Sequence, residues 1–385
     1  MAVERTLPTR EAADLLELTR DLAVKEIAPR AAGDEEAGAF PRDLFTLLGG
    51  AGLLGLPYAA EYGGGEQPYE VYLQVVEELA SSWLAVGLGL SVHTLSCFPL
   101  AGHGTEAQRA AWLPDMLGGD LLGAYCLSEA DSGSDAAALT TRAQAGPEGY
   151  RIDGAKSWIT HGGAADFYTL FARTGAPDSG GRGISCLHVP AGTEGVSADA
   201  PEAKMGMRSS PTAAVRFDGA RVPEEARIGA EGEGFAIALA ALDSGRLGIA
   251  ACAVGVAQAA LDLAAGYARR RRQFGRPIGD FQGLSFMLAD MATQVEAARE
   301  LYLAAARRRD AGRAFGRQAA MAKLFASDAA MRVTTDAVQV LGGYGYTVDF
   351  PAERLMREAK VLQIVEGTNQ IQRMVIGRHL AKEHE

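Results

Sequence analysis

The sequence predicts an α+β fold made of an N-terminal helical domain, a middle antiparallel β domain and a C-terminal four-helix bundle. Apolar residues recur at helical spacing near the start of the chain and again in its last third. Between these parts, short runs rich in aromatic and β-branched residues alternate with turn signals. We therefore expect three domains, over residues 1–121, 122–230 and 231–385.

The N-terminal domain is predicted from helical periodicity and helix-start signals. Leu15 and Leu18 are spaced as on one helical face, and Thr9 is placed to cap the start of that helix. A second helix is expected to begin at Pro41 and to end before Pro57, because proline is tolerated in the first turn but interrupts a helix later.

The middle domain is predicted from four strand-like runs and two Asp-Gly pairs. Asp153-Gly154 and Asp218-Gly219 are typical of hairpin turns. The runs are "YRIDGAKSWIT", "DFYTLFA", "GISCLHVP" and "AAVRFDGARVP".

The C-terminal domain is predicted from three long segments, 235–272, 282–310 and 316–340, each of which fits a bundle helix. The middle segment carries a continuous apolar stripe at spacings of three and four. Its members are Phe281, Leu284, Leu288, Met291, Val295 and Ala298.

Composition excludes several classes of protein. The formal net charge of −11 opposes binding to nucleic acid. The four cysteines are scattered, which predicts neither a disulfide framework nor a metal site and fits a reducing cytoplasm. The N-terminus has no apolar core of the signal-peptide type. The sequence contains no run of about 18 apolar residues, so we expect no membrane span.

Several short segments could carry chemistry, but each also has an ordinary structural interpretation. The loop "GAYCLSEADSGSD" (residues 123–135) offers small residues and hydroxyls that suit a planar polar ring and a phosphate, or it is a turn. The segment "KSWIT" (156–160) places an aromatic side chain beside a hydroxyl at the end of a strand, where it could contact a ligand, or it belongs to the hydrophobic core. The arginine run in "ARRRRQFG" could bind a phosphate group, or it is the solvated end of a helix, where cations interact favourably with the helix dipole. Glu366 in "QIVEGTNQIQR" is a base, or a solvated glutamate.

Taken together, these segments resemble the acyl-CoA dehydrogenase family. The segments that carry the resemblance are "AYCLSEADSGSD", "KSWIT", "KMGMRSS", "RRQFGRPIGDFQ", "QVLGGYGY" and "IVEGTNQIQ". They occur in the family's order and spacing, and the resemblance covers nearly the whole chain. The resemblance implies an FAD-dependent enzyme that oxidises acyl-CoA thioesters.

The resemblance also implies three sets of binding residues. The FAD set of this chain is Tyr125, Leu127, Ser128, Gly133, Ser134, Trp158, Ile159, Thr160, Thr368 and Gln370. A second set would reach the FAD of a neighbouring subunit and comprises Arg271, Gln273, Phe274, Gln282, Gln339, Leu341, Gly342 and Gly343. The acyl-CoA set is Ser134, Asp243, Arg246 and Gly367.

Glu366 occupies the position of the family's catalytic base. Abstracting the α-proton of a thioester needs a strong base, and burial would raise the pKa of a carboxylate there. In the family, the β-hydride moves to FAD as the α-proton leaves, and a trans-2-enoyl-CoA is formed. The isovaleryl-type relatives lack a glutamate at this position, so the presence of Glu366 argues against that subgroup.

The resemblance further implies a homotetramer that passes electrons to an electron-transfer flavoprotein. "LSVHTLSC" (residues 90–97) favours a short or branched short acyl group. Three alternatives remain: an acyl-CoA oxidase that uses oxygen, a member of the family's DNA-damage-linked branch, and a catalytically silent helical scaffold. The oxidases carry an extra C-terminal domain and the DNA-damage branch an added basic region, and neither is expected here.

Overall fold

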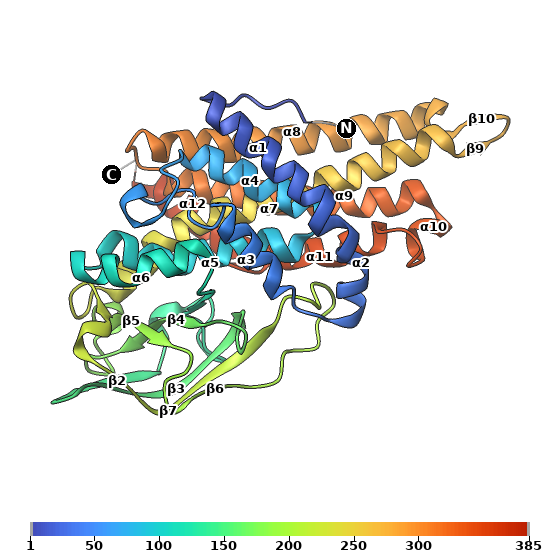
Figure 1. Ribbon diagram of the computed structural model, residues 1–385. Helices are drawn as coiled ribbons and strands as arrows, with labels where there is room; N and C mark the ends of the chain where they lie inside the picture. Colours follow the sequence, from blue (N-terminus) through green and yellow to red (C-terminus); the bar gives the residue numbers. More distant parts are fainter. Residues whose placement is uncertain (1–2, 383–385) are drawn as a thin grey trace.

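The computed structural model describes residues 3–382 and confirms the predicted α+β architecture. Helices from both ends of the chain pack into one elongated helical body, and the β domain lies against one side of it at one end (Figure 1). The helical and β parts share a core cluster that joins α5 and α6 to the sheet. The body of the molecule is thus made of segments that are distant in the sequence.

The two N-terminal helices with predicted start signals, α1 and α3, begin directly after Thr9 and Pro41. The Thr9 hydroxyl accepts a hydrogen bond from the Ala12 backbone N–H at 3.1 Å, which confirms the predicted cap. The helix after Pro41 ends at Gly50, earlier than expected, because residues 51–57 form turns. The helices are α1 (Arg10–Leu22), α2 (Ala28–Ala37), α3 (Arg42–Gly50), α4 (Tyr69–Ser82), α5 (Leu84–His103) and α6 (Glu106–Gly118).

The middle domain is one sheet with the strand order β6-β7-β3-β2-β4-β5-β8, with β1 paired to β4. Most pairs are antiparallel as predicted, but β1 runs parallel to β4, and β2 meets β4 in a single parallel pair. The strands are β1 (Gly123–Cys126), β2 (Arg142–Gly146), β3 (Gly149–Thr160), β4 (Phe167–Arg173), β5 (Ile184–Pro190), β6 (Val196–Ala198), β7 (Thr212–Val222) and β8 (Arg227–Ile228).

The two Asp-Gly pairs are not hairpin turns, contrary to the prediction. Asp153 and Asp218 lie opposite each other inside the paired strands β3 and β7, where the register shifts by a β-bulge. Gly219 adopts a φ of 64° at this bulge, and its N–H donates to the Asp153 carboxylate at 3.0 Å. The left-handed conformation that the Asp-Gly signal predicts is therefore present, but it serves a bulge rather than a strand reversal.

The three long C-terminal helices match their predicted ranges closely. The middle of α7, residues 244–257, is buried on all sides, because α4 and α5 pack on this helix together with α8 and α9. The apolar stripe of α8 is buried at Met291, Val295 and Ala298 and half-buried nearer its start. The elements are α7 (Gly234–Arg270), β9 (Arg272–Gln273), β10 (Arg276–Pro277), α8 (Gln282–Asp310), α9 (Gly316–Leu341), α10 (Gly343–Tyr346), α11 (Ala352–Ala359) and α12 (Asn369–Lys382).

Two helices in the described part of the chain, α5 and α7, are long and apolar enough to cross a membrane by length and composition alone. Neither helix contains an uninterrupted run of 18 apolar residues, because Ser91 and His93 interrupt α5 and Asp243 and Arg246 interrupt α7. In the apolar windows of α5 and α7, 89% and 78% of the residues are buried inside the protein. Since their apolar surfaces are already covered by other helices, both have the character of core helices.

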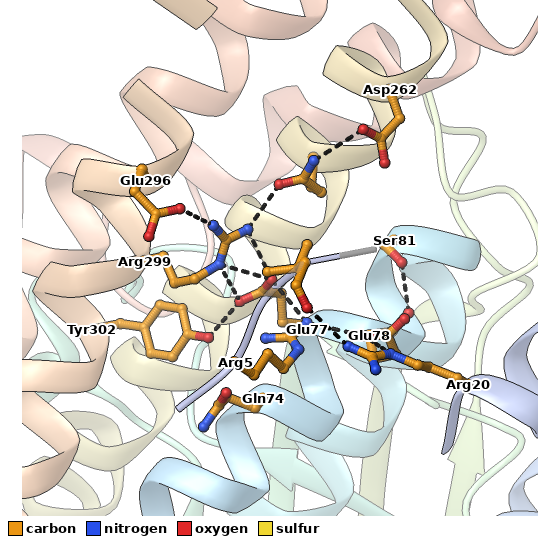
Figure 2. Close-up of polar contacts among 12 residues, drawn as sticks. Arg5, Arg20, Gln74, Glu77, Glu78, Ser81, Asp262, Glu296, Arg299 and Tyr302 are labelled. Carbon is orange, nitrogen blue, oxygen red and sulfur yellow. Dashed lines mark hydrogen bonds and ion pairs between the residues drawn. The ribbon is translucent and has the colours of Figure 1, made fainter. Parts of the chain in front are cut away.

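A buried charge cluster joins the N-terminal segment to the helical body (Figure 2). The Glu77 carboxylate on α4 accepts hydrogen bonds from Arg5 at 3.0 Å and from Arg299 of α8 at 3.1 Å. The Tyr302 hydroxyl donates to the same carboxylate. Burial alone would raise the pKa of Glu77, but Arg5 and Arg299 more than offset it and hold this pKa below its usual value.

All four cysteines of the chain (Cys97, Cys126, Cys186 and Cys252) are buried as free thiols. Burial raises the pKa of each thiol. They pack as small apolar side chains, and this agrees with the absence of a predicted disulfide framework.

Candidate active site

Glu366 lies in a turn between α11 and α12, and its carboxylate points into the protein. Both carboxylate oxygens are buried, and neither has a hydrogen-bond partner among the described residues. Burial raises the pKa of Glu366 to about 7, although the Lys323 and Arg246 cations act to lower it. A carboxyl group with this pKa is part ionised near neutral pH and can accept a proton.

The carboxylate is accommodated because α7 has a glycine opposite it. A Cβ atom added to Gly245 would lie 2.1 Å from Glu366 Oε2, far inside a normal contact distance. The absence of a side chain at this position lets the carboxylate lie directly against the helix.

The turn that carries Glu366 has an unusual backbone and several anchors. Glu366 has a φ of 52° and Gly367 a φ of 89°, so two consecutive residues are left-handed. The Gly367 carbonyl accepts hydrogen bonds from Lys323 Nζ at 2.9 Å and from Gln372 Nε2 at 2.8 Å. Thr368 Oγ1 accepts from the Ile371 N–H at 3.3 Å and so helps to start α12.

Asp243 and Arg246, the predicted CoA contacts, lie on the same stretch of α7 as Gly245. Arg246 Nη1 donates to Asp243, and Arg246 Nε is buried with no partner among residues 3–382. Burial raises the pKa of Asp243, and Arg246 opposes this effect. An unpartnered buried donor beside Glu366 is what a site for a polar ligand requires.

The glycine- and serine-rich loop after β1 is held by a buried ion pair. Lys156 Nζ, which is fully buried, donates to Glu129 Oε1 at 2.8 Å and to the Leu127 carbonyl at 2.9 Å. Glu129 also accepts from the backbone N–H groups of Thr140 and Thr141. These bonds set the path of the backbone at Leu127 and Ser128.

The same arrangement brings the two β-domain motifs together. The Ser157 N–H donates to the Ser128 carbonyl at 2.9 Å, so "KSWIT" lies beside the loop that contains Ser128. Trp158 follows with a φ of 63° and a side chain that is 63% exposed, whereas Ile159 is buried and Thr160 is half-buried. The Tyr125 hydroxyl donates to the Ala238 carbonyl of α7 at 3.2 Å, which ties β1 to the helix that faces Glu366.

A second group of predicted residues lies elsewhere in the chain. Arg271 and Gln273 line an open cavity of about 470 Å³ together with Leu341, Gly342 and Gly343. The β9-β10 hairpin next to it is at the end of the helical body remote from the β domain (Figure 1). Within one chain the structure therefore does not bring this group to Glu366.

The remaining predicted residues are exposed and make few contacts. A Cβ added to Gly133 would meet nothing within 4 Å. Phe274 is 92% exposed and has a φ of 51°. The other exposed members of the predicted sets are Ser134, Gln282, Gln339 and Gln370.

Backbone conformation gives an independent indication of where the sites lie. Among residues 3–382, six non-glycine residues have a positive φ, and three of them (Trp158, Phe274 and Glu366) belong to the predicted sets. Such conformations are costly and cluster at functional sites.

Sequence reasoning missed Lys323, Lys156 and Gly245. Lys323 had a detectable signal, since it stands among alanines 319, 322, 326 and 330 at helical spacing and so falls on the buried face of α9. Lys156 lies inside the "KSWIT" segment, but the segment's aromatic residue and hydroxyl do not indicate a buried ion pair. Nothing local to Gly245 indicates that a carboxylate 121 positions later packs against it. No group of three or more histidine, cysteine, aspartate or glutamate side chains placed to hold a metal ion occurs in the described range.

Comparisons with known proteins cover almost the whole chain. Family models for the N-terminal, middle and C-terminal domains of acyl-CoA dehydrogenase match residues 9–120, 124–220 and 232–381. An acyl-CoA dehydrogenase of Bacillus subtilis is 48% identical over 373 residues, which are 97% of this chain and 98% of that protein.

Two solved structures have nearly the same fold. Butyryl-CoA dehydrogenase from Megasphaera elsdenii superposes with a TM-score of 0.95 at 42% identity, over 98% of this chain and 100% of that one. A chain from the structural study of the electron transferring flavoprotein of Acidaminococcus fermentans gives a TM-score of 0.95 at 43% identity, over 98% and 99% of the two chains.

Proposed function

The chain belongs to the acyl-CoA dehydrogenase family of oxidoreductases, and we propose that it converts a short or branched short acyl-CoA to the trans-2-enoyl-CoA, with Glu366 as base. The observation that carries the proposal is the buried Glu366 carboxylate. It has no hydrogen-bond partner among the described residues and a pKa near neutrality. A structural glutamate at such depth is normally paired.

The residues around Glu366 fit the needs of α-proton removal. The unpartnered oxygens leave the carboxylate free to accept a proton from a ligand instead of from the protein. The unusual turn fixes the direction of the side chain, and a base held in place avoids the loss that misplacement causes. Arg246 offers its unpartnered Nε to the polar part of the ligand.

The family is FAD-dependent, and the loop after β1 fits a flavin. Small residues at Gly133 and Ser134 leave open space, and Trp158 presents an exposed ring beside Ser128. We infer that Tyr125, Leu127, Ser128, Trp158, Ile159 and Thr160 hold the flavin, together with Thr368 and Gln370. When bound, FAD supplies the acceptor for the β-hydride.

Anaerobic flavin bleaching tests the role of Glu366. Glu366→Gln keeps the size of the side chain but cannot accept the proton, so bleaching by substrate should slow by at least about a hundredfold. Glu358→Gln is a matched control, because Glu358 is also buried and burial raises its pKa to about 7, but its side chain pairs with Arg354.

Both variants should keep wild-type FAD content, and Glu358→Gln should bleach at nearly the wild-type rate. Bleaching of Glu366→Gln at the wild-type rate would refute the assignment of Glu366 as base.

A small cavity lies next to Gly245, the residue of α7 against which the Glu366 carboxylate packs. Its volume is about 10 Å³, and Gly245 and Leu95 are among its lining residues. Tyr58 and Tyr69 close it, and both hydroxyls are anchored: Tyr58 donates to the Thr94 carbonyl and Tyr69 to the Ser244 carbonyl at 3.1 Å. This cavity has space for about one water molecule, so an acyl group of any length would need its walls to move, and the preference for a short or branched short acyl group rests on the resemblance of residues 90–97.

Turnover across a series of acyl-CoA thioesters tests this preference. We expect kcat/KM to be highest with butyryl-CoA or its branched isomer and to fall steeply towards octanoyl-CoA. A maximum at octanoyl-CoA would refute the short-chain assignment while leaving the reaction class intact.

We also infer a homotetramer that delivers electrons to an electron-transfer flavoprotein in the cytoplasm. Three large side chains near the β9-β10 end of the bundle, Phe274, Tyr346 and Val348, are each at least 86% exposed and need cover. The cavity lined by Arg271 lies at the same end and would receive a neighbour's FAD. Sedimentation of the FAD-loaded protein should give a tetramer, and a fully active monomer would refute this inference.

The electron acceptor is tested separately. Rapid reoxidation of the reduced FAD by air, without an electron-transfer flavoprotein, would favour the oxidase alternative.

A further inference from the structure

We propose that Lys323 is a positioning residue for Glu366: its ammonium group anchors the turn that carries the carboxylate and favours the ionised, proton-accepting form. The proposal rests on the proposed role of Glu366 as base. It starts from the position of Lys323, which is fully buried on α9 yet reaches two atoms just after Glu366 in the chain.

The contacts of Lys323 are directed at the turn. Its Nζ donates to the Gly367 carbonyl at 2.9 Å and to Asn369 Oδ1 at 2.8 Å. Gly367 is the second of the two left-handed residues, so this bond restrains the conformation that directs the Glu366 side chain inward. Asn369 is the first residue of α12, so the same ammonium group fixes both sides of the turn.

Hydrogen bonding alone does not explain a buried cation at this place. A neutral donor would satisfy the carbonyl and the amide oxygen without the cost of burying a charge. Burial lowers the pKa of Lys323 to about 8, and the attraction of Glu366 is the largest effect that opposes it. The cation is therefore retained at neutral pH, and Glu366 is the principal anion that it serves.

The other groups near the pair do not replace Lys323. Besides Lys323, the groups that face Glu366 are Arg246 and the Cys252 thiol on α7 and the hydroxyls of Tyr69 on α4 and Tyr125 on β1. Arg246 already pairs with Asp243.

Asp328, the second anion near Lys323, accepts from Asn369, Gln363 and Arg373. Its charge is thus already engaged by other donors.

Three substitutions separate the charge of Lys323 from its hydrogen bonds. Lys323→Met removes both, Lys323→Gln keeps a donor but removes the charge, and Lys323→Arg keeps the charge. Ser327→Ala is the matched control, because Ser327 Oγ also contacts Asn369 Oδ1, at 3.1 Å, but is neutral. FAD content and thermal melting identify any variant that fails to fold. If Lys323→Met fails to fold, Lys323→Gln still tests the proposal.

The decisive measurement is the pKa of Glu366, from an infrared titration of its carboxyl band assigned by difference from Glu366→Gln. The pH dependence of flavin bleaching gives a second reading. We expect Lys323→Met and Lys323→Gln to raise this pKa by at least about one unit. Lys323→Arg and Ser327→Ala should leave it close to the wild-type value.

A folded Lys323→Gln variant with an unchanged Glu366 pKa would overturn the proposal. The infrared band reports on Lys323 even if Glu366 is not the base. Wild-type bleaching by Glu366→Gln would instead refute the proposed function, so the two failures can be told apart.

Discussion

Replacing Glu77 by glutamine should destabilise the protein far more than the same change at the neighbouring Glu78. Glu77 is fully buried and neutralises two guanidinium groups, those of Arg5 and Arg299 (Figure 2). Two nitrogens of Arg5 already lack a partner among the described residues, so the loss leaves that cation dependent on Glu78 alone. Removing one partner of a buried ion pair costs about 3–5 kcal/mol.

The control is closely matched. Glu78 makes its ion pairs with Arg5 at 3.0 Å and Arg20 at 3.3 Å, but its side chain is 18% exposed and Arg20 is 38% exposed. The change in net charge is identical in the two variants. Glu78→Gln leaves Glu77 in place to neutralise the buried Arg5, and the pair of Glu78 with Arg20 is partly open to solvent, so we expect a loss of less than about 1 kcal/mol.

Thermal melting at fixed protein and FAD concentrations measures the difference. For 385 residues the unfolding entropy is about 0.8 kcal/mol/K, so Glu77→Gln should lower the Tm by about 4–6 °C and Glu78→Gln by about 1 °C or less. Adding Arg299→Met to Glu77→Gln should restore part of the lost stability, because it removes a buried cation that has lost its counter-ion. Equal shifts for the two glutamates would refute the view that the buried cluster acts as a stabilising unit.

Three further predictions follow from the buried groups and from α7. Because burial raises the pKa of Glu366 to about 7, the contribution of this carboxyl group to stability should fall as pH rises from 4.5 to 7. Glu366→Gln should therefore melt like wild type at pH 4 and be up to about 3 kcal/mol more stable than wild type at pH 8, and a gap that is constant with pH would contradict this. Gly255→Ala would place a Cβ 2.4 Å from the Glu77 carbonyl and should cost about 1–3 kcal/mol, whereas Gly266→Ala has space and should stabilise by about 0.5–1 kcal/mol, as chemical denaturation can show. Lys156→Met leaves the Glu129 carboxylate without its buried cation and should weaken FAD binding at least about tenfold by equilibrium dialysis; an unchanged FAD affinity would show that the loop keeps its path without this ion pair.

The sequence predicted the long helices well because their information is local. α7, α8 and α9 are repeated apolar patterns, and each observed end lies within two residues of its predicted position. The prediction of hairpin turns at the Asp-Gly pairs was wrong because the local signal indicates only a left-handed residue, and both a β-bulge and a hairpin turn can contain one. The parallel pairing of β1 with β4 joins strands about 40 residues apart, and no local pattern encodes it.

The candidate site divides in the same way. The motif predicts Glu366 as the base, but the packing of Glu366 against Gly245 and its anchoring by Lys323 depend on how α7 and α9 cross the turn. Those contacts arise only from tertiary packing. The position of the β9-β10 hairpin, which Arg271 directly precedes, at the far end of the bundle likewise appears only in three dimensions (Figure 1).

The burial of all four thiols makes this chain a ready background for site-specific labelling. Thiolates react with maleimides, whereas these thiols are protonated and shielded from solvent. A cysteine introduced at an exposed position such as Glu17 on α1 would be the single fast-reacting thiol, without prior removal of the native ones. Fluorophores or spin labels could then report on docking and assembly in the otherwise natural protein.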